Sequence, residues 1–506
     1  MDDTQWHERR GGAEKPDAGV SVSSSLAALA IASTVAAAKL AGCSPHSVTT
    51  EPEPPIEPPS AYETERAGEP PEAWWLDLQD AELEVLIDRT FAGNLRLASA
   101  WARLEQARAT ARQVGAATWP QVSAEVRASR QEVRNLLADT DDVPDDLPFE
   151  IDDTVRQDTI SADVAASYEL DLWRRLDSEQ RAAALDAEAA RDDAEILAIS
   201  LAAEVAETWY DLVAERAQAE LFDDQIEINE TFLELAELRF ERGLAPAGDV
   251  HQQREQLQST RARRELAEAR AEVARYQLAV LVGDVPGATA FAEQDELPAL
   301  PAPPATGLPA DLLERRPDVR AARRRVEAAD HRIAAAIADR LPSLQITGSA
   351  GFQSDSIRDL LTTPIWSLAA SLGQILFDGG RLRAEVDRAE AVRTEVTAEY
   401  GLALLEALAE VEGALAQERQ QRAYIAERER ELDSAEAALR DITFRYRRGL
   451  IEFLPVLTAL QSVQALELEL ITARRQALSF RIQLYRALGG TWPQDLEPGR
   501  EAEEPA

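Results

Sequence analysis

The chain has 506 residues and is poor in aromatic side chains but rich in Ala, Glu, Arg and Leu, a composition that favours long helices. Its formal net charge of -39 argues against a nucleic-acid partner, because binding to phosphates requires a positive surface. The single cysteine, Cys43, excludes an intrachain disulfide and a cysteine-based metal site. The four histidines are scattered and never stand at helical ligand spacing, so we expect no metal and no cofactor.

Residues 1–42 are predicted to be a signal peptide of the lipoprotein type. The apolar run from Ser21 to Ala38 is too short and too rich in Ala and Ser to span a membrane, and basic residues precede it. Leu40–Cys43 (LAGC) resembles a bacterial lipobox, in which the cysteine is acylated and becomes the first mature residue. An ordinary signal peptide that happens to contain a cysteine is the alternative. The Pro/Glu-rich residues 43–72 are then an extended tether that cannot bury a core.

The first repeat, residues 73–285, is predicted to contain two strands. Apolar and polar residues alternate over about 121–131 and 158–172, the period of a strand with one apolar face. The loop between them holds eight acidic residues from Asp139 to Asp153. We expect a solvated surface loop there, with divalent-cation bridging at a lipopolysaccharide surface as the alternative.

Two long helices are predicted after these strands, at about 177–242 and 249–282. No Gly or Pro occurs from Asp177 to Arg242, and one helix over that stretch would be on the order of 100 Å long. Apolar residues recur there at steps of three and four, which is typical of amphipathic or coiled-coil helices. Gly243 suits a helix end and Pro246 forbids continuation, so the two helices should form a hairpin.

The second repeat, residues 311–492, follows a Pro/Ala-rich linker at 286–310 and precedes an acidic tail at 493–506. The same patterns predict strands at about 343–353 and 365–377, and helices at about 381–448 and 456–488. Three landmarks share one offset of 206 residues, namely Leu176 and Leu382, Phe240 and Tyr446, and Gly283 and Gly489. Because chance would not keep three landmarks in register, internal duplication is predicted.

The four predicted strands have the length of membrane-crossing strands but are too few to close a barrel, since the smallest membrane barrels have about eight. An open sheet edge in lipid would leave backbone groups without partners. The strands therefore belong either to a sheet in water or to a barrel shared with other subunits. The predicted signal peptide favours the shared barrel in a bacterial outer envelope.

Several segments resemble the outer membrane efflux protein family, meaning TolC-like channels and in particular the lipoprotein branch of pump outlets. The resemblance covers roughly Trp74 to Trp492. It is carried by LPADLLERRPDVRAARRRVEAADHRIAAAIADRLPSLQITGSAG (Leu308–Gly351), LFDGGRLRAEV (Leu376–Val386), RYRRGLIEFLPVLTALQS, LYRALGGTW and, in the first half, YELDLWRRL.

The resemblance implies a mainly α fold with membrane β: duplicated long helical hairpins in a trimeric α-barrel tunnel, and four strands per chain in a shared 12-stranded β-barrel. It implies a homotrimer in the cell outer membrane, lipid-anchored and extending into the periplasm. The implied partners are outer membrane lipid, a periplasmic adaptor protein and an inner-membrane proton-driven transporter. The implied function is passive conduction of small molecules as the channel subunit of a tripartite efflux pump.

The resemblance also implies which residues act at the periplasmic tips of the hairpins. Contact with the adaptor is expected from two matching triplets, Arg242, Gly243, Leu244 and Arg448, Gly449, Leu450. Plain helix capping without a partner is the alternative for the glycines. A tunnel constriction is expected at Leu454 and Thr458. Thr458 stands where related outlets carry an aspartate, which puts a charged gate there in doubt, and Asp249 is a weak substitute.

Two other functions remain open at this point. A structural envelope lipoprotein would explain the helices and Cys43, but not four strands of membrane length. An outlet for protein secretion of type I would keep the channel and change the cargo. We find no phosphate-binding loop, nucleophile elbow or metal-ligand cluster, so we expect no enzyme activity.

Overall fold

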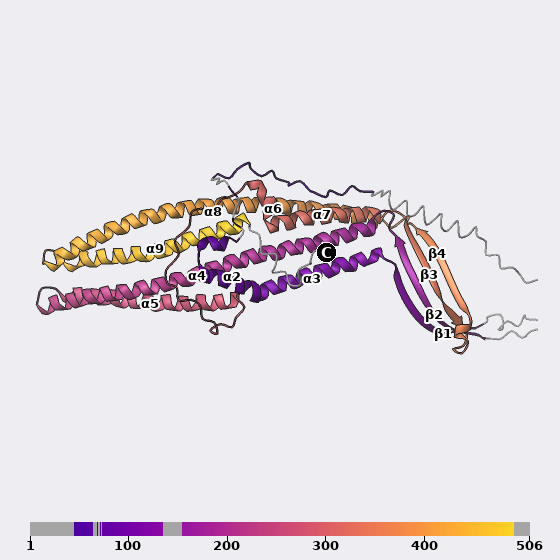
Figure 1. Ribbon diagram of the computed structural model, residues 1–506, viewed down its shortest axis with the longest axis horizontal. Helices are drawn as coiled ribbons and strands as arrows, with labels where there is room; N and C mark the ends of the chain where they lie inside the picture. The colour runs from indigo at the N-terminus through magenta and orange to yellow at the C-terminus, as the bar shows by residue number, and fades with distance from the viewer. Residues whose placement is uncertain (1–44, 64–67, 69–70, 72, 135–153, 490–506) are drawn as a thin grey trace, which may run out of the picture. The chain divides into compact units, whose positions relative to one another are not determined.

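The computed structural model describes residues 45–134 and 154–489, except 64–67, 69–70 and 72 (Figure 1). The predicted signal peptide, Cys43, the acidic loop and the acidic tail lie outside the described residues. The chain forms two compact units, and both halves of the sequence contribute to each. One unit contains the strands and the other contains the long helices.

The four strands pair antiparallel in the order β1-β2-β3-β4, so that the β2–β3 pairing joins the first half of the chain to the second. β4 ends before the predicted residue 377, because its Gly373 pairs with Ser343, where β3 begins. β2 starts earlier than predicted because β1 extends to Arg134 and pairs with Thr154. The bounds are β1 Gln121–Arg134, β2 Thr154–Leu170, β3 Ser343–Ser354 and β4 Pro364–Gly373.

The register of the sheet brings the apolar positions of all four strands onto one face. One ladder across the sheet runs Val122, Ala166, Gly348, Leu368. Because side chains alternate between faces along a strand, the ladders two and four residues away carry the same face. These ladders are Ala124, Val164, Ala350, Trp366 and, from β2 to β4, Leu170, Leu344, Leu372. The opposite face carries mostly Ser, Thr, Gln and charged residues, for example Gln121, Ser167, Thr347 and Ala369 across one ladder.

The helical unit contains the four predicted long helices and three more, α2, α3 and α7, where no element was predicted. The helices are α2 Ala81–Gly93, α3 Leu95–Gly115, α4 Arg175–Glu241, α5 Ala247–Leu281, α7 Pro317–Ala338, α8 Arg381–Arg447 and α9 Phe453–Leu488, with short helices at η1 Trp74–Leu78 and α6 Leu312–Arg315. α4 with α5 and α8 with α9 form two long hairpins that lie side by side (Figure 1).

α9 starts at Phe453, earlier than the predicted residue 456. Pro455 falls in its first turn, where a missing N–H removes no helical hydrogen bond. By length and mean hydropathy, α9 is also the one described helix that could cross a membrane. Its many buried residues pack within the helical unit, which accounts for its apolar composition without a membrane.

The described part of the tether lies along α7 and α8. Thr49 donates its backbone N–H to the buried Asp330 of α7 at 2.7 Å. A Cβ at Gly401 of α8 would stand 2.9 Å from the Cγ of Pro55, so the glycine makes room for the tether. Tyr62 is only 4% exposed, within an apolar cluster that includes Val319. The prediction that the tether buries nothing is therefore wrong at Tyr62.

The glycines that end α5 and α9 are sites of close packing as well as helix ends. Gly283 has a φ of 83°, and a Cβ there would lie 2.2 Å from the carbonyl oxygen of Gly93. Gly489, 206 residues later, has a φ of 68° and would place a Cβ 2.9 Å from the carbonyl oxygen of Arg315. Each long return helix is thus seated against the short helices of its own half.

Candidate functional site

The two hairpin turns have the same backbone geometry at matching positions. In the first turn, the Gly243 N–H donates to the Phe240 carbonyl at 2.9 Å and the Leu244 N–H donates to the Arg239 carbonyl at 2.8 Å. These two bonds define a Schellman motif, which requires a left-handed residue after the helix. Gly243 supplies it with a φ of 67°.

The second turn repeats this motif 206 residues later. Gly449 donates to Tyr446 at 2.8 Å and Leu450 donates to Arg445 at 3.0 Å, with a φ of 75° at the glycine. Helix capping therefore accounts for both glycines.

The side chains that flank the two glycines are not needed for this capping. Leu244 and Leu450 are 64% and 69% exposed, so each presents an apolar side chain to its surroundings. Arg242 and Arg448 are exposed as well, and the Arg448 guanidinium lies over the Phe444 ring at 4.2 Å. Each tip therefore carries one free apolar group beside one cation.

The two tips are fixed to each other by contacts that the sequence did not single out. Arg239 of α4 donates to the Tyr446 carbonyl of α8 at 2.9 Å, and its guanidinium stacks on the Tyr446 ring at 4.3 Å. Beneath it, Phe453, Val456 and Leu457 form a buried cluster with Tyr446. The offset of 206 residues, which relates Arg239 to Arg445 and Phe240 to Tyr446, is the signal that could have drawn attention to this contact.

The predicted constriction residues, Leu454 and Thr458, lie one turn apart on an exposed face of α9. Leu454 is 57% exposed, and the Thr458 hydroxyl donates to the Leu454 carbonyl at 3.0 Å. The threonine hydroxyl is therefore bonded within the helix. Asp249 lies in the first turn of α5, at the other tip. Burial raises the pKa of its carboxyl, the carboxylate of Glu452 raises this pKa further, and Arg239 lowers it. Among the described residues, no group of three or more His, Cys, Asp or Glu is arranged to hold a metal.

The comparisons with known proteins decide the family. The sequence model described as Outer membrane efflux protein matches residues 86–284 and 308–490. This chain belongs to the outer membrane efflux protein family.

Among its relatives, the pyoverdine export outer membrane protein OpmQ of Pseudomonas aeruginosa is 31% identical over 424 residues, which cover 84% of this chain and 88% of OpmQ. The toluene efflux pump outer membrane protein TtgF of Pseudomonas putida is 29% identical over 422 residues, which cover 83% of this chain and 85% of TtgF.

Solved structures agree with this assignment. The outer-membrane channel OprN is similar with a TM-score of 0.80 at 26% identity, over 89% of this chain and 100% of that one. The outer membrane protein VceC from Vibrio cholerae has a TM-score of 0.75 at 27% identity, over 83% and 99% of the two chains. The chain is an outer-membrane efflux channel component, and the predictions of a mainly helical fold with a small sheet and of an efflux channel are confirmed.

In this efflux channel chain, the linker between the halves is held by buried ions. Glu418 of α8 and Arg481 of α9 are almost completely buried and form an ion pair at 2.5 Å. Arg481 also donates to the carbonyls of Ala302 at 3.1 Å and Pro301 at 3.2 Å. Arg422 bridges Glu418 at 3.0 Å and the Pro301 carbonyl at 2.5 Å. The guanidinium groups therefore clamp the linker backbone, and the carboxylate balances their charge.

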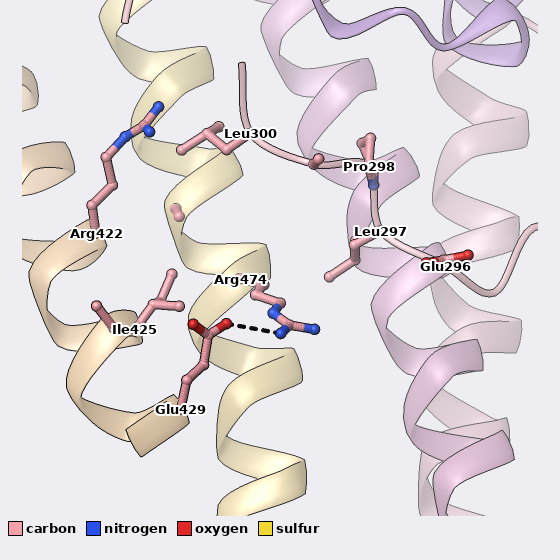
Figure 2. Close-up of a pocket in the computed structure, with 11 residues that line it drawn as sticks. Glu296, Leu297, Pro298, Leu300, Arg422, Ile425, Glu429 and Arg474 are labelled. Atoms are coloured by element: carbon pink, nitrogen blue, oxygen red, sulfur yellow. Dashed lines mark hydrogen bonds and ion pairs between the residues drawn. The ribbon is translucent and has the colours of Figure 1, made fainter. Parts of the chain in front are cut away.

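A surface groove of about 480 Å³ lies next to this clamp, between the linker and the second hairpin. Figure 2 shows Leu297 and Leu300 of the linker on one side and Ile425 of α8 on the other. The Arg474–Glu429 pair, at 2.9 Å, crosses its floor. The linker thus forms one wall of this groove, and the second hairpin forms the rest of its lining.

The first hairpin holds the same linker from its own side. Arg216 of α4 donates to the Ala292 carbonyl at 2.6 Å. Arg216 and Arg422 are separated by the repeat offset of 206 residues, so the duplicated arginine grips the linker twice. These clamp residues were not predicted from the sequence, although the offset alone could have paired them.

Proposed function

We propose that three copies of this chain form one outlet. Their sheets close into a twelve-stranded barrel in the outer membrane, and their six hairpins enclose a tunnel that extends into the periplasm. The single observation that carries this proposal is the sheet, which has one apolar face, one polar face and free edges at β1 and β4. Four strands cannot close alone, and three such sheets give an apolar outside for lipid and a polar lumen for water.

The test is conductance. The full-length trimer, reconstituted into planar lipid bilayers, should give long-lived ion-conducting steps. As a control we would reverse the apolar face at its centre with Val164→Asp and Leu368→Asp, which should prevent insertion. A purified trimer that inserts and never conducts would rule out the channel and leave the structural lipoprotein as the better explanation.

The tips are proposed to bind a periplasmic adaptor protein that links the outlet to an inner-membrane proton-driven transporter. The support is that the side chains of Leu244 and Leu450 are exposed at matching positions and take no part in the hydrogen bonds of their own turns. Leu244→Asp with Leu450→Asp should abolish co-purification of the adaptor and export-dependent resistance in cells. Leu95→Asp, at an equally exposed leucine on α3, is the matched control. Unchanged adaptor binding in the double variant would contradict the assignment.

The constriction is proposed to be an apolar and hydroxyl ring made by Leu454 and Thr458. Thr458→Asp should then restore a charged ring and make the conductance sensitive to divalent cations, whereas the parent should not respond. A cation response in the parent of the same size as in Thr458→Asp would place the charge elsewhere, with Asp249 the next residue to test.

The anchor is proposed to be a lipid on Cys43, because the one cysteine of the chain falls at the end of the LAGC sequence. Cys43→Ala should abolish metabolic labelling with palmitate, and labelling that persists would refute the anchor. The barrel is able to insert without it.

The cargo is proposed to be small molecules. The support is that OpmQ is described as exporting pyoverdine and TtgF as part of a toluene efflux pump. Secretion of a protein through a type I system is the alternative. Genes for an adaptor and a proton-driven transporter beside this one would favour the first, and a gene for an ATP-driven secretion transporter would favour the second.

A further inference from the structure

The first long hairpin buries three uncharged polar side chains in the seam between α4 and α5 (Figure 1). Asn229, Gln253 and Thr260 are all at most 3% exposed. The Asn229 amide donates to the Thr260 hydroxyl at 3.0 Å, and the Asn229 side-chain oxygen accepts from the Gln253 amide at 3.2 Å. Gln253 also donates to the backbone carbonyl of Asn229 at 2.9 Å. These three residues form one polar cluster that joins the two helices.

The polar cluster occupies seam positions of a coiled coil. From Val250 to Leu278, the buried residues of α5 recur mostly at steps of three, four and seven, which is the spacing of the a and d positions of heptads. Gln253 and Thr260 stand one heptad apart on this seam. A polar side chain at such a position lowers stability and specifies the register of the helices. The side-chain oxygen of Gln253 has no hydrogen-bond partner among the described residues, which adds to the cost of burying it.

The second hairpin carries apolar residues where the first carries the polar cluster. Adding the offset of 206 residues to the three positions gives Ala435, Ala459 and Leu466. Both halves form a long antiparallel pair of helices all the same. A hairpin of this kind therefore forms without a polar cluster, and the cluster has a reason particular to the first hairpin.

The tips of the two hairpins supply this reason. In the second hairpin, the rings of Tyr446 and Phe453 pack 5.5 Å apart within a buried apolar cluster. Bulky side chains that interdigitate across a seam fit in one register only. The first hairpin has Phe240 and Ala247 at the matching positions, and Phe240 is 48% exposed. The first hairpin therefore lacks the aromatic packing that fixes the register of the second.

The turn of the first hairpin leaves the register of its helices to their side chains. Its two Schellman bonds, from the N–H groups of Gly243 and Leu244, both end on carbonyls of α4. Surface ion pairs such as Arg254 with Glu237, at 2.9 Å, contribute little. A slip of α5 along α4 by one heptad would keep apolar residues in the seam, but it would separate Asn229 from one of its two partners.

We propose that the polar cluster sets the register of α4 against α5 and excludes slipped pairings of the first hairpin. A slip by one heptad displaces one helix along the other by about 10 Å. The residues between the helices, Arg242 to Pro246, would have to bridge this displacement, so the Schellman motif and the exposed Leu244 would leave the tip. The cluster thus positions the tip from within the hairpin, and this role does not depend on the trimer or the adaptor proposed above.

Replacing the polar cluster by the residues of the second hairpin separates register from stability. The graft variant combines Asn229→Ala, Gln253→Ala and Thr260→Leu. Its melting temperature should be equal to that of the parent or higher, because removing all partners of a buried polar contact together leaves no polar group unpaired. The matched control is Gln252→Ala with Gln258→Ala, at exposed glutamines of α5. Thr260→Ser keeps the hydroxyl and should behave as the parent.

Pairs of cysteines report the register in the purified full-length protein. Glu237→Cys with Arg254→Cys replaces an ion pair of the native register. Glu237→Cys with Arg261→Cys or with Ala247→Cys reports a slip of one heptad towards the tip or away from it. Dibromobimane, a short thiol crosslinker, joins neighbouring cysteines, and mass spectrometry of the peptides quantifies the products. The 237–254 product should dominate in the parent, and a slipped product should increase several-fold in the graft variant.

The two measurements decide the proposal together. A crosslinking pattern in the graft variant that matches the parent would overturn the role in register. A melting temperature below that of the parent would overturn it as well, because the polar cluster would then act by stabilising the hairpin. Slipped products in the control at positions 252 and 258, as abundant as in the graft variant, would show that the register does not depend on the buried cluster.

Discussion

The buried clamp on the linker gives a prediction whose size follows from the structure. Glu418→Gln removes the carboxylate that balances two guanidinium groups, those of Arg481 and Arg422. Breaking a buried ion pair by removing one partner costs about 3–5 kcal/mol, because the remaining charge stays buried without compensation. Local opening of the linker then becomes about 100-fold or more easier, since each 1.4 kcal/mol is a factor of ten.

Limited proteolysis measures this opening directly. Thermolysin cleaves beside apolar residues such as Leu297 and Leu300, which the linker carries next to the clamp. Cleavage there should be about 100-fold faster in Glu418→Gln than in the parent when the linker recloses faster than it is cleaved, because the rate then follows the population of the open form.

The control is Glu429→Gln, the same substitution on the same helix. It breaks the half-exposed pair with Arg474, which is worth about 0.2–1 kcal/mol, or roughly a fivefold change at most. If the two variants are cleaved at similar rates, the buried pair does not hold the linker.

Three further predictions use positions where burial or space decides the outcome. Burial raises the pKa of Asp249 above its ordinary value of 3.8, so the free energy of unfolding should increase as pH falls from neutral through that raised pKa. Asp249→Asn should remove this increase, which urea unfolding at a series of pH values measures. An unchanged pH profile in the variant would contradict the prediction. Gly283→Ala should destabilise the helical unit by several kcal/mol in the same assay, because its Cβ would overlap the Gly93 carbonyl, and a loss of only about 1 kcal/mol would argue against this contact. Gly413→Ala should stabilise α8 by about 1 kcal/mol, because a Cβ at 413 meets no other atom. Gly401→Ala should give no such gain, because a Cβ at 401 would meet Pro55 of the tether. Equal gains in the two variants would contradict the contact between Gly401 and the tether.

The long helices and strands could be predicted because their signals are local. A stretch without Gly or Pro and with apolar residues at steps of three and four is recognisable without its neighbours. The C-terminal glycines Gly243 and Gly449 were likewise identified as helix ends, and their φ angles confirm it. α7 was missed although its buried apolar residues recur at steps of three and four, namely Val319, Ala322, Val326, Ala329 and Ile333.

What the sequence did not reveal depends on contacts between distant segments. Gly401 interrupts a long helix without a local reason, and the structure supplies the reason, because Pro55 of the tether passes over it. Tyr62 lies in a polar, Pro-rich stretch, and nothing local announces that it is buried against α7 and α8. The roles of the tip and constriction residues, including Arg242, Leu454 and Thr458, are proposals, because they depend on contacts with other chains.

The departures from the repeat have a physical cause in the linker, which each chain contains once. Glu418 and Arg481 match Leu212 and Arg275 in the first half. Leu212 is buried in an apolar cluster, and Arg275 is partly exposed and pairs with Glu272 at 3.5 Å. A carboxylate at 212 would stand inside this apolar cluster, and Arg275 already pairs with Glu272, so burying the carboxylate would cost several kcal/mol. In the second half, both Arg422 and the buried Arg481 donate to linker carbonyls, and Glu418 balances the two charges. In the first half, Arg216 donates to the linker while position 212 stays apolar, so the duplicated helices carry an ion pair in one half and a leucine in the other.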